Sequence, residues 1–173
     1  MTRDEWRLHP RFPAQVLLLG SHENFRRVSA YLLQEAQAGR PQAPLESLFR
    51  RWISAMRGHE AYEEHKLYPF LERRWDVSFK GAEAGHVELH KCYDAVIEAF
   101  ARVRAAGDAA KKGERAMVIQ ALEAHDRVLR EHLELEENLV VPLLLELSPE
   151  EFEFFCNSSI ATLLRAYEKR AKN

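Results

Sequence analysis

Two parts of the chain repeat one arrangement of histidine and glutamate side chains. His59 is followed four positions later by Glu63, a second glutamate comes directly after it, and proline follows ten positions after the histidine. The same arrangement begins at His132 and places Glu136 four positions later. Residues four positions apart lie on the same face of an α-helix, so each histidine would lie beside its glutamate. Imidazole and carboxylate groups placed together in this way can bind a metal ion.

The glutamates of both pairs fall on helix faces that otherwise carry apolar side chains. Burial of an unpaired carboxylate costs several kcal/mol, so a positive group must meet each one. Arginine is one candidate for this role, and Arg26 lies on the inward face of an earlier predicted helix. A metal ion is the other candidate. It is favoured because His22 and His86, on two further predicted helices, also point inward.

The ligand types narrow the choice of metal. Mixed imidazole and carboxylate ligands suit iron, manganese or zinc, and two carboxylates that can bridge suit a pair of ions better than a single ion. A ferritin-like site needs Glu-x-x-His on two helices, and only Glu83 and His86 have that spacing. A zincin site needs His-Glu-x-x-His, and the sequences that begin at His22 and His59 both lack the second histidine.

Four long amphipathic segments must position these side chains. Apolar residues recur every three to four positions in the segments 13–38, 44–70, 79–106 and 112–147. No segment alternates with a period of two, which predicts an all-α fold. Helices of this length with short connections are typical of an up-down-up-down four-helix bundle. We expect a single domain over residues 1–173, with the bundle core at about 13–147.

The two ends of the chain lie outside the repeat. Ser148, Pro149 and Glu151 form a helix-start pattern with a capping box. They predict a short C-terminal helical extension over about 149–170. Residues 1–10 show no periodic pattern and are expected to form an extended arm.

The composition excludes several kinds of partner. The chain has 25 Lys and Arg residues against 27 Asp and Glu residues, a net charge of −2, so it lacks the basic excess of a nucleic-acid-binding protein. No apolar run approaches the ~20 residues of a membrane span or forms a signal peptide. Cys92 and Cys156 do not have a metal-binding or redox spacing. We expect a cytoplasmic protein that binds neither nucleic acid nor membranes.

The combination of motifs resembles the hemerythrin/HHE cation-binding domain over about residues 13–147, including the prolines Pro69 and Pro142 that follow the His-Glu pairs. The resemblance implies a four-helix bundle with two non-haem iron ions, joined by an oxo or hydroxo bridge, with zinc or manganese as substitutes. The metal ligands that it implies are His22, His59, Glu63, His86, His90, His132 and Glu136. Glu63 and Glu136 would bridge the two irons. His22 and His59 would complete one iron, and His86 and His132 would complete the other.

Two of these assignments had alternatives. Oxygen-carrying members of the family place the fourth-helix carboxylate five residues after the histidine, which corresponds to Glu137. Five residues turn a helix position by about 140°, so we expect Glu136 to be the ligand and Glu137 to be turned away from His132 unless the helix is locally distorted. For His90, the alternative to direct ligation is a place behind the ligands or in the lining of the cavity.

Four other polar residues near the motif are assigned structural roles. His125 precedes the fourth-helix histidine by two turns, about 10 Å along the axis, which predicts a core position. Tyr62 and Tyr93 fall on inward faces and are expected to be packed there. Glu60 is expected to be solvated.

The function that the resemblance implies is the binding or sensing of a small molecule, O2, nitric oxide or peroxide, at the two-metal site. The alternatives are an enzyme that turns over peroxide or nitric oxide at the same irons, and a module for iron storage or iron sensing. Binding and turnover both need an open coordination position, so the sequence does not separate them. We expect the protein to be a monomer or a homodimer.

Overall fold

The computed structural model describes residues 1–16, 18–107, 112–163 and 165. Along the chain its helices are α1 (Arg3–Leu8), α2 (Leu18–Gln37), α3 (Gln42–Tyr62), the π-helical turn η1 (Glu63–Leu67), α4 (Tyr68–Trp75), α5 (Lys80–Ala106), α6 (Lys112–Glu146) and α7 (Pro149–Asn157). No strand occurs in the described ranges, and the all-α prediction is confirmed. None of the helices in these ranges has both the length and the apolar character needed to cross a membrane.

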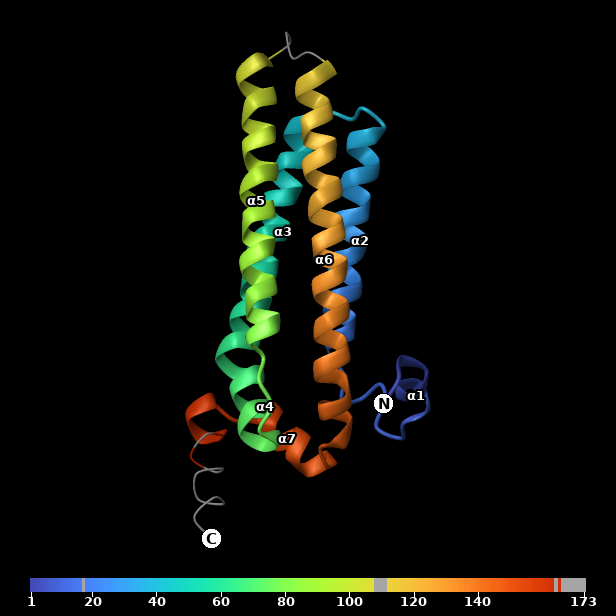
Figure 1. Cartoon of the computed structure of the whole chain (residues 1–173), viewed down its shortest axis with the longest axis vertical. Helices are drawn as coiled ribbons and strands as arrows, with labels where there is room; N and C mark the ends of the chain where they lie inside the picture. Colours follow the sequence, from blue (N-terminus) through green and yellow to red (C-terminus); the bar gives the residue numbers. More distant parts are fainter. Residues whose placement is uncertain (17, 108–111, 164, 166–173) are drawn as a thin grey trace.

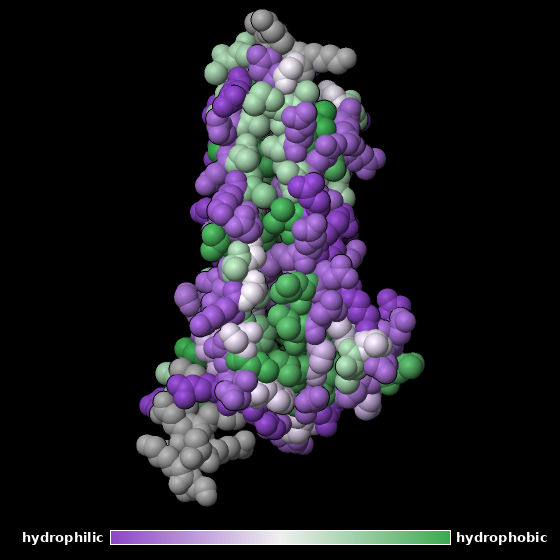
Figure 2. All heavy atoms as spheres, viewed as in Figure 1, coloured by the Kyte–Doolittle hydropathy of each residue, from purple (hydrophilic) through white to green (hydrophobic). Residues whose placement is uncertain are grey.

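The four long helices α2, α3, α5 and α6 lie side by side along the long axis of the molecule (Figure 1). Helix α5 contacts α3 and α6, and helix α2 also contacts α3 and α6, so the contacts run around the four helices in a ring. The inward stripe of each helix is thereby enclosed by its neighbours. Hydrophilic side chains cover much of the outer face shown in Figure 2.

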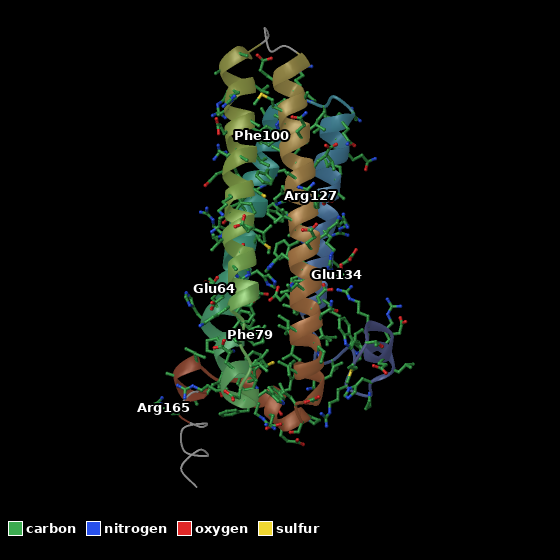
Figure 3. All side chains as sticks on the ribbon, in the orientation of Figure 1. Glu64, Phe79, Phe100, Arg127, Glu134 and Arg165 are labelled. Atoms are coloured by element: carbon green, nitrogen blue, oxygen red, sulfur yellow. The ribbon has the colours of Figure 1, made fainter. Side chains whose placement is uncertain are left out.

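Apolar side chains fill the interior in two main clusters. The Phe100 cluster includes Phe49 and Trp52, and the Phe79 cluster includes Phe70 and Leu144. Figure 3 shows that Phe100 and Phe79 lie at different heights along the axis. The interior is therefore apolar at two heights along the bundle axis, and the side chains between these two clusters can be polar.

The second predicted segment is interrupted where Pro69 follows the first His-Glu pair. Helix α3 passes into the π turn η1 and then into α4, with the proline in the first turn of α4. Proline has no N–H to donate, which explains why the regular hydrogen-bond ladder changes directly before it. Helix α4 ends at Trp75, and the next residue, Asp76, has left-handed backbone angles.

The first ten residues contain a helix, so the predicted extended arm is wrong. Thr2 and Glu5 form a capping box at the start of α1, and Trp6 is buried. Trp6 packs with Val141 and Leu145 of α6. The sequence contained this signal, because Thr2 and Glu5 have the capping-box spacing.

Helix α2 begins at Leu18, later than the predicted start at residue 13. The segment before it binds the end of α6 instead. Gln15 Nε2 donates to the carbonyl oxygens of Leu144 and Leu147 at 2.9 and 3.0 Å. Leu144 lies in the last turn of α6 and Leu147 directly follows the helix, where carbonyls lack the regular intrahelical N–H partner.

The C-terminal extension begins as predicted. Ser148 and Glu151 form the expected capping box at the start of α7, which ends at Asn157. After a break at Ser158 and Ser159, residues 160–163 are again helical. The remainder of the predicted extension, 166–170, lies outside the described residues.

Candidate metal centre

Each of the four long helical segments brings polar side chains to the level between the two apolar clusters. In α2, His22 lies between Leu18 of the Phe79 cluster and Phe25 of the Phe100 cluster. The same order, from one cluster through polar residues to the other, holds in the three other segments. Apolar packing on both sides therefore keeps these polar side chains in the interior, where they meet one another.

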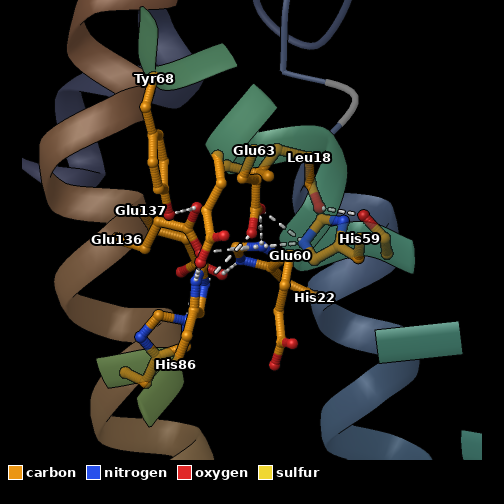
Figure 4. Close-up of polar contacts among 12 residues, drawn as sticks. Leu18, His22, His59, Glu60, Glu63, Tyr68, His86, Glu136 and Glu137 are labelled. Carbon is orange, nitrogen blue, oxygen red and sulfur yellow. Dashed lines mark hydrogen bonds and ion pairs between the residues drawn. The ribbon is translucent and has the colours of Figure 1, made fainter. Parts of the chain in front are cut away.

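Four of the predicted ligands meet in one group, drawn in Figure 4. Ligand atoms of His22, His59, Glu63 and Glu136 all lie within 4.8 Å of one another. His59 Nε2 is 2.7 Å from Glu63 Oε1, as expected for neighbours four positions apart. His22 Nε2 is 3.7 Å from that oxygen and 3.5 Å from Glu136 Oε2. The group joins residues of α2, α3, η1 and α6.

Two more predicted ligands lie beside the same carboxylates. His86 Nε2 is 3.5 Å from Glu63 Oε2. His132 Nε2 is 3.7 Å from Glu136 Oε2. The ring centroids of these two imidazoles are 4.7 Å apart, close to the 4.9 Å that separates the first pair, His22 and its partner on α3. Each carboxylate thus contacts both imidazole pairs.

Several of the converging atoms are buried and lie near atoms of opposite type, yet none forms a hydrogen bond of acceptable geometry within the described part of the chain. They are both carboxylate oxygens of Glu63, Oε2 of Glu136, Nε2 of His86 and both ring nitrogens of His132. Buried polar atoms without partners are costly, and a cation would satisfy carboxylate oxygens and imidazole nitrogens together. This donor set fits iron, manganese or zinc.

Arginine does not neutralise the two central carboxylates. In the ranges that the structure describes, the ion pairs of Glu63 and Glu136 are formed with histidines alone. Arg26 instead lies 2.7 Å from Glu137 Oε1, and Arg3 lies 2.7 Å from Glu137 Oε2. Glu137 is only 2% exposed, and its ion pairs are with Arg3, Arg26 and His22, whereas His132 pairs with Glu136.

The second glutamate of each pair orients a histidine of another helix. Glu137 Oε1 is 3.0 Å from His22 Nδ1, and Glu64 Oε1 is 2.7 Å from His86 Nδ1. In each case the carboxylate accepts a hydrogen bond from Nδ1–H, which leaves Nε2 free to face the cluster. The repeated Glu-Glu motif therefore provides one oxygen donor and one orienting group in each half of the chain.

The structure does not bring His90 into the cluster. Its Nε2 lies 2.7 Å from Glu60 Oε2, and its side chain is 45% exposed. Glu60 is itself buried and accepts a 2.9 Å hydrogen bond from the Tyr93 hydroxyl. The prediction that Glu60 is solvated is therefore wrong, whereas the inward packing of Tyr93 is confirmed.

Three further residues complete the surroundings. Tyr68, which the sequence reasoning did not single out, donates a 2.7 Å hydrogen bond to Glu136 Oε1. His125 is fully buried against Trp52, as predicted, and burial lowers the pKa of its imidazole to about 4. Tyr62 is 43% exposed, so its predicted inward packing is wrong.

The cluster residues control one another's protonation. Burial alone would lower the pKa values of His22 and His86, but their contacts with glutamates outweigh it and raise both to about 9. Burial, together with the charge of Glu63, raises the pKa of Glu136 to about 8. Burial would also raise the pKa of Glu63, but three histidines hold it well below its usual range. A cation would therefore compete with protons for this site.

Gly85 gives the His132 imidazole its place, although the sequence analysis did not single it out. A Cβ atom at residue 85 would lie 2.4 Å from His132 Nδ1, closer than two such atoms can approach. Only a residue without a side chain allows α5 to approach the imidazole of α6 so closely. Its position directly before His86 was the one available signal.

Comparison with known proteins agrees with this geometry. The sequence model of the family described as the hemerythrin HHE cation-binding domain matches residues 15–144. The match includes α2 to α5 and nearly all of α6, and hence all six residues of the two imidazole pairs and the two carboxylates. No curated protein and no solved structure matches the chain.

Proposed function

The chain belongs to the hemerythrin HHE cation-binding domain family, and on this basis we propose that its buried cluster binds two iron ions and presents them to dioxygen, nitric oxide or peroxide. The observation that carries the proposal is the placement of two carboxylates between two imidazole pairs. Glu63 and Glu136 would each contact both ions. His22 and His59 would complete one ion, and His86 and His132 would complete the other. His90 is left out because it faces Glu60.

The protein residues have separable tasks in this proposal. The four long helices serve as an up-down-up-down bundle whose apolar clusters keep water from the polar level. Glu64 and Glu137 hold the Nδ1 protons of two histidines, and Tyr68 holds its hydroxyl proton toward Glu136. Bound iron would supply redox chemistry and an open coordination position for a small molecule.

The test of small-molecule binding is anaerobic reduction of the iron-loaded protein, followed by cycles of oxygen addition and removal. A carrier or sensor should take up oxygen and return it, with the visible spectrum cycling repeatedly. Oxidation in one direction, with peroxide consumed over many turnovers per site, would assign an enzyme instead. If oxygen, nitric oxide and peroxide cause no spectral change and are not consumed, the proposal is contradicted, and a storage or structural role for the metal is favoured.

Substitution of Glu137 should weaken metal binding although Glu137 is not proposed as a ligand. Glu137→Ala removes the group that orients His22, and loss of such a partner lowers metal affinity by about 10- to 100-fold. Glu137→Gln keeps a hydrogen-bond acceptor and should recover part of the loss. Competition with a chromophoric chelator measures the affinity. Glu134→Ala, an exposed change on the same helix, should leave it unchanged. Equal affinity of Glu137→Ala and wild type would contradict this role.

Gly85 and Gly81, both in α5, provide a variant and its control for testing the close approach of α5 to the His132 imidazole. Gly85→Ala should reduce metal content, because its Cβ would displace the imidazole. Gly81→Ala has no atom within 4 Å of its new Cβ and should retain the metal. Gly81 is the second residue of α5, so the stability gain from alanine should be smaller than the roughly 1 kcal/mol typical of a helix interior. Elemental analysis and thermal unfolding of both variants test this, and normal metal content in Gly85→Ala would overturn it.

A further inference from the structure

We propose that an apolar pocket beside His59 is the route by which a small uncharged molecule, such as dioxygen or nitric oxide, reaches the metal centre. The pocket has a volume of about 270 Å³. Its apolar lining comes from Leu18, Leu67, Leu144, Phe152 and Phe155, and His59 also lines it. The inference rests on the proposed function and adds the path by which the small molecule reaches the metal centre.

His59 is the most accessible of the six proposed ligands. Its side chain is 11% exposed, whereas those of His22, Glu63 and Glu136 are completely buried. The side chains of the second imidazole pair are each only 2% exposed. A molecule that approaches from solvent therefore first meets the cluster at His59, which is where the pocket lies.

The lining of the pocket selects by polarity. The lining also includes Gln15, Ser21, Tyr62 and Cys156, but the Gln15 amide and the Ser21 hydroxyl already donate to backbone carbonyls. No Lys, Arg, Asp or Glu among the described residues lines the pocket, so a charged molecule would enter at a large desolvation penalty. A second pocket near the cluster is lined by Arg3, Arg7 and Arg26 and reaches Glu137. Since Glu137 lies behind His22, that charged pocket leads to an orienting group and not to the proposed ligand atoms.

Helix α7 forms the outer wall of the apolar pocket through Phe152 and Phe155. Phe155 is buried, its ring lies 4.6 Å from that of Phe70, and Lys66 Nζ lies 4.9 Å above it. Lys66 also donates to the carbonyl oxygen of Cys156 at 3.2 Å, which fixes the helix to η1. This wall lies outside residues 15–144, so the pocket is completed by a part of the chain beyond the matched domain.

Two substitutions change the pocket in opposite directions. Ser21 lines the pocket, and its hydroxyl donates within its own helix to the Leu18 carbonyl, so Ser21→Trp fills the space at the loss of one local bond. Phe152→Ala opens the wall. Phe154→Ala is the matched control, because Phe154 lies on the same helix, is 40% exposed and does not line the pocket.

The first measurement is the association rate of nitric oxide with the reduced, iron-loaded protein by stopped flow. We expect Ser21→Trp to slow association by at least about tenfold, equivalent to ~1.4 kcal/mol, with metal content unchanged. Phe152→Ala should accelerate it severalfold, and Phe154→Ala should leave it at the wild-type rate. Unchanged rates in both pocket variants with full metal content would overturn the entry route. Absence of metal in the wild-type protein would instead overturn the proposed function.

The second measurement does not depend on iron chemistry. Xenon enters dry apolar cavities, so methyl NMR of the zinc-loaded protein should show xenon-induced shifts at Leu18, Leu67 and Leu144. Ser21→Trp should abolish these shifts and Phe154→Ala should keep them. Absence of xenon shifts at these leucines in the wild-type protein would show that the pocket does not admit small apolar molecules.

Discussion

Glu63→Ala should lose both metal ions from the protein, the largest effect that we expect from any single substitution. Glu63 Oε1 is 2.7 Å from His59 Nε2, and Glu63 Oε2 is 3.5 Å from His86 Nε2. One carboxylate thus contacts both imidazole pairs, and its removal takes an oxygen donor from each ion. Elemental analysis after anaerobic loading and desalting should show two irons per wild-type chain and almost none in the variant.

Two further variants make this result specific. Glu136→Ala should have the same effect, because Glu136 Oε2 lies 3.5 Å from His22 and 3.7 Å from His132. Glu134→Ala removes the same charge from the exposed face of the same helix and should keep both ions. Circular dichroism should show all three variants folded. A Glu63→Ala protein that still holds two tightly bound irons would refute the bridging role, and one that holds a single iron would assign Glu63 to one ion only.

The second large effect concerns the metal-free protein, whose stability against unfolding should fall as the pH rises from 6.5 to 9. In the metal-free protein the pKa values of His22 and His86 are raised from 6.5 to about 9. The stability that these imidazolium groups contribute is fully present below pH 6.5 and is lost as the pH rises through 9. At about 1.4 kcal/mol per pKa unit, each contributes on the order of 3 kcal/mol.

Glu136 and His132 also have shifted pKa values and could strengthen or oppose this loss of stability with rising pH. The Glu136 carboxyl, with its pKa raised from 4.5 to about 8, retains its proton in the folded state after the unfolded chain has lost it. Stability therefore also falls with rising pH between 4.5 and 8. The pKa of His132 is lowered to about 3 by burial, so it adds stability only as the pH rises from 3 to 6.5 and has no effect above that range. From pH 6.5 to 9, His22, His86 and Glu136 therefore all lower the stability of the metal-free protein as the pH rises, and His132 does not oppose them.

Thermal unfolding of chelator-treated and zinc-loaded protein at pH 6.5 and 9 tests this prediction. The metal-free protein should melt at a lower temperature at pH 9. Deprotonation of His22, His86 and Glu136 favours metal binding, so the gap between loaded and metal-free protein should widen over the same range. His86→Gln should reduce the pH dependence of the metal-free form. A metal-free melting temperature that is equal or higher at pH 9 would contradict the assignment of these charges.

The helices could be predicted from the sequence because long apolar stripes with one period leave few alternatives. The inward direction of His22, Glu63 and Glu136 followed from the same stripes. On α6, however, a single stripe was too narrow a description. This helix packs against α2, α5 and α1, so it buries a wider arc than one stripe. Not every apolar residue of α6 is buried, and Leu135, directly before Glu136, is 44% exposed.

Glu60 and Glu137 are buried by partners on other helices, which the periodic pattern of a single helix does not reveal. Glu60 is buried because Tyr93 and His90 of α5 bind its two oxygens. Glu137 is buried because Arg26 of α2 and Arg3 of α1 meet its charge. Such pairings depend on which helices are neighbours and on their relative height along the axis, and the periodicity of each helix contains neither. The same tertiary contacts direct His90 toward Glu60.

The measurement that tests the central claim most directly is the metal content of the wild-type protein together with its visible spectrum. The protein should bind two irons per chain after anaerobic loading at neutral pH, and its oxidised form should absorb in the visible range and change on addition of azide. Loaded protein should also melt at a higher temperature than metal-free protein. A protein that retains no transition metal and melts at the same temperature with and without iron would contradict the account, because its buried histidines and glutamates would then satisfy one another.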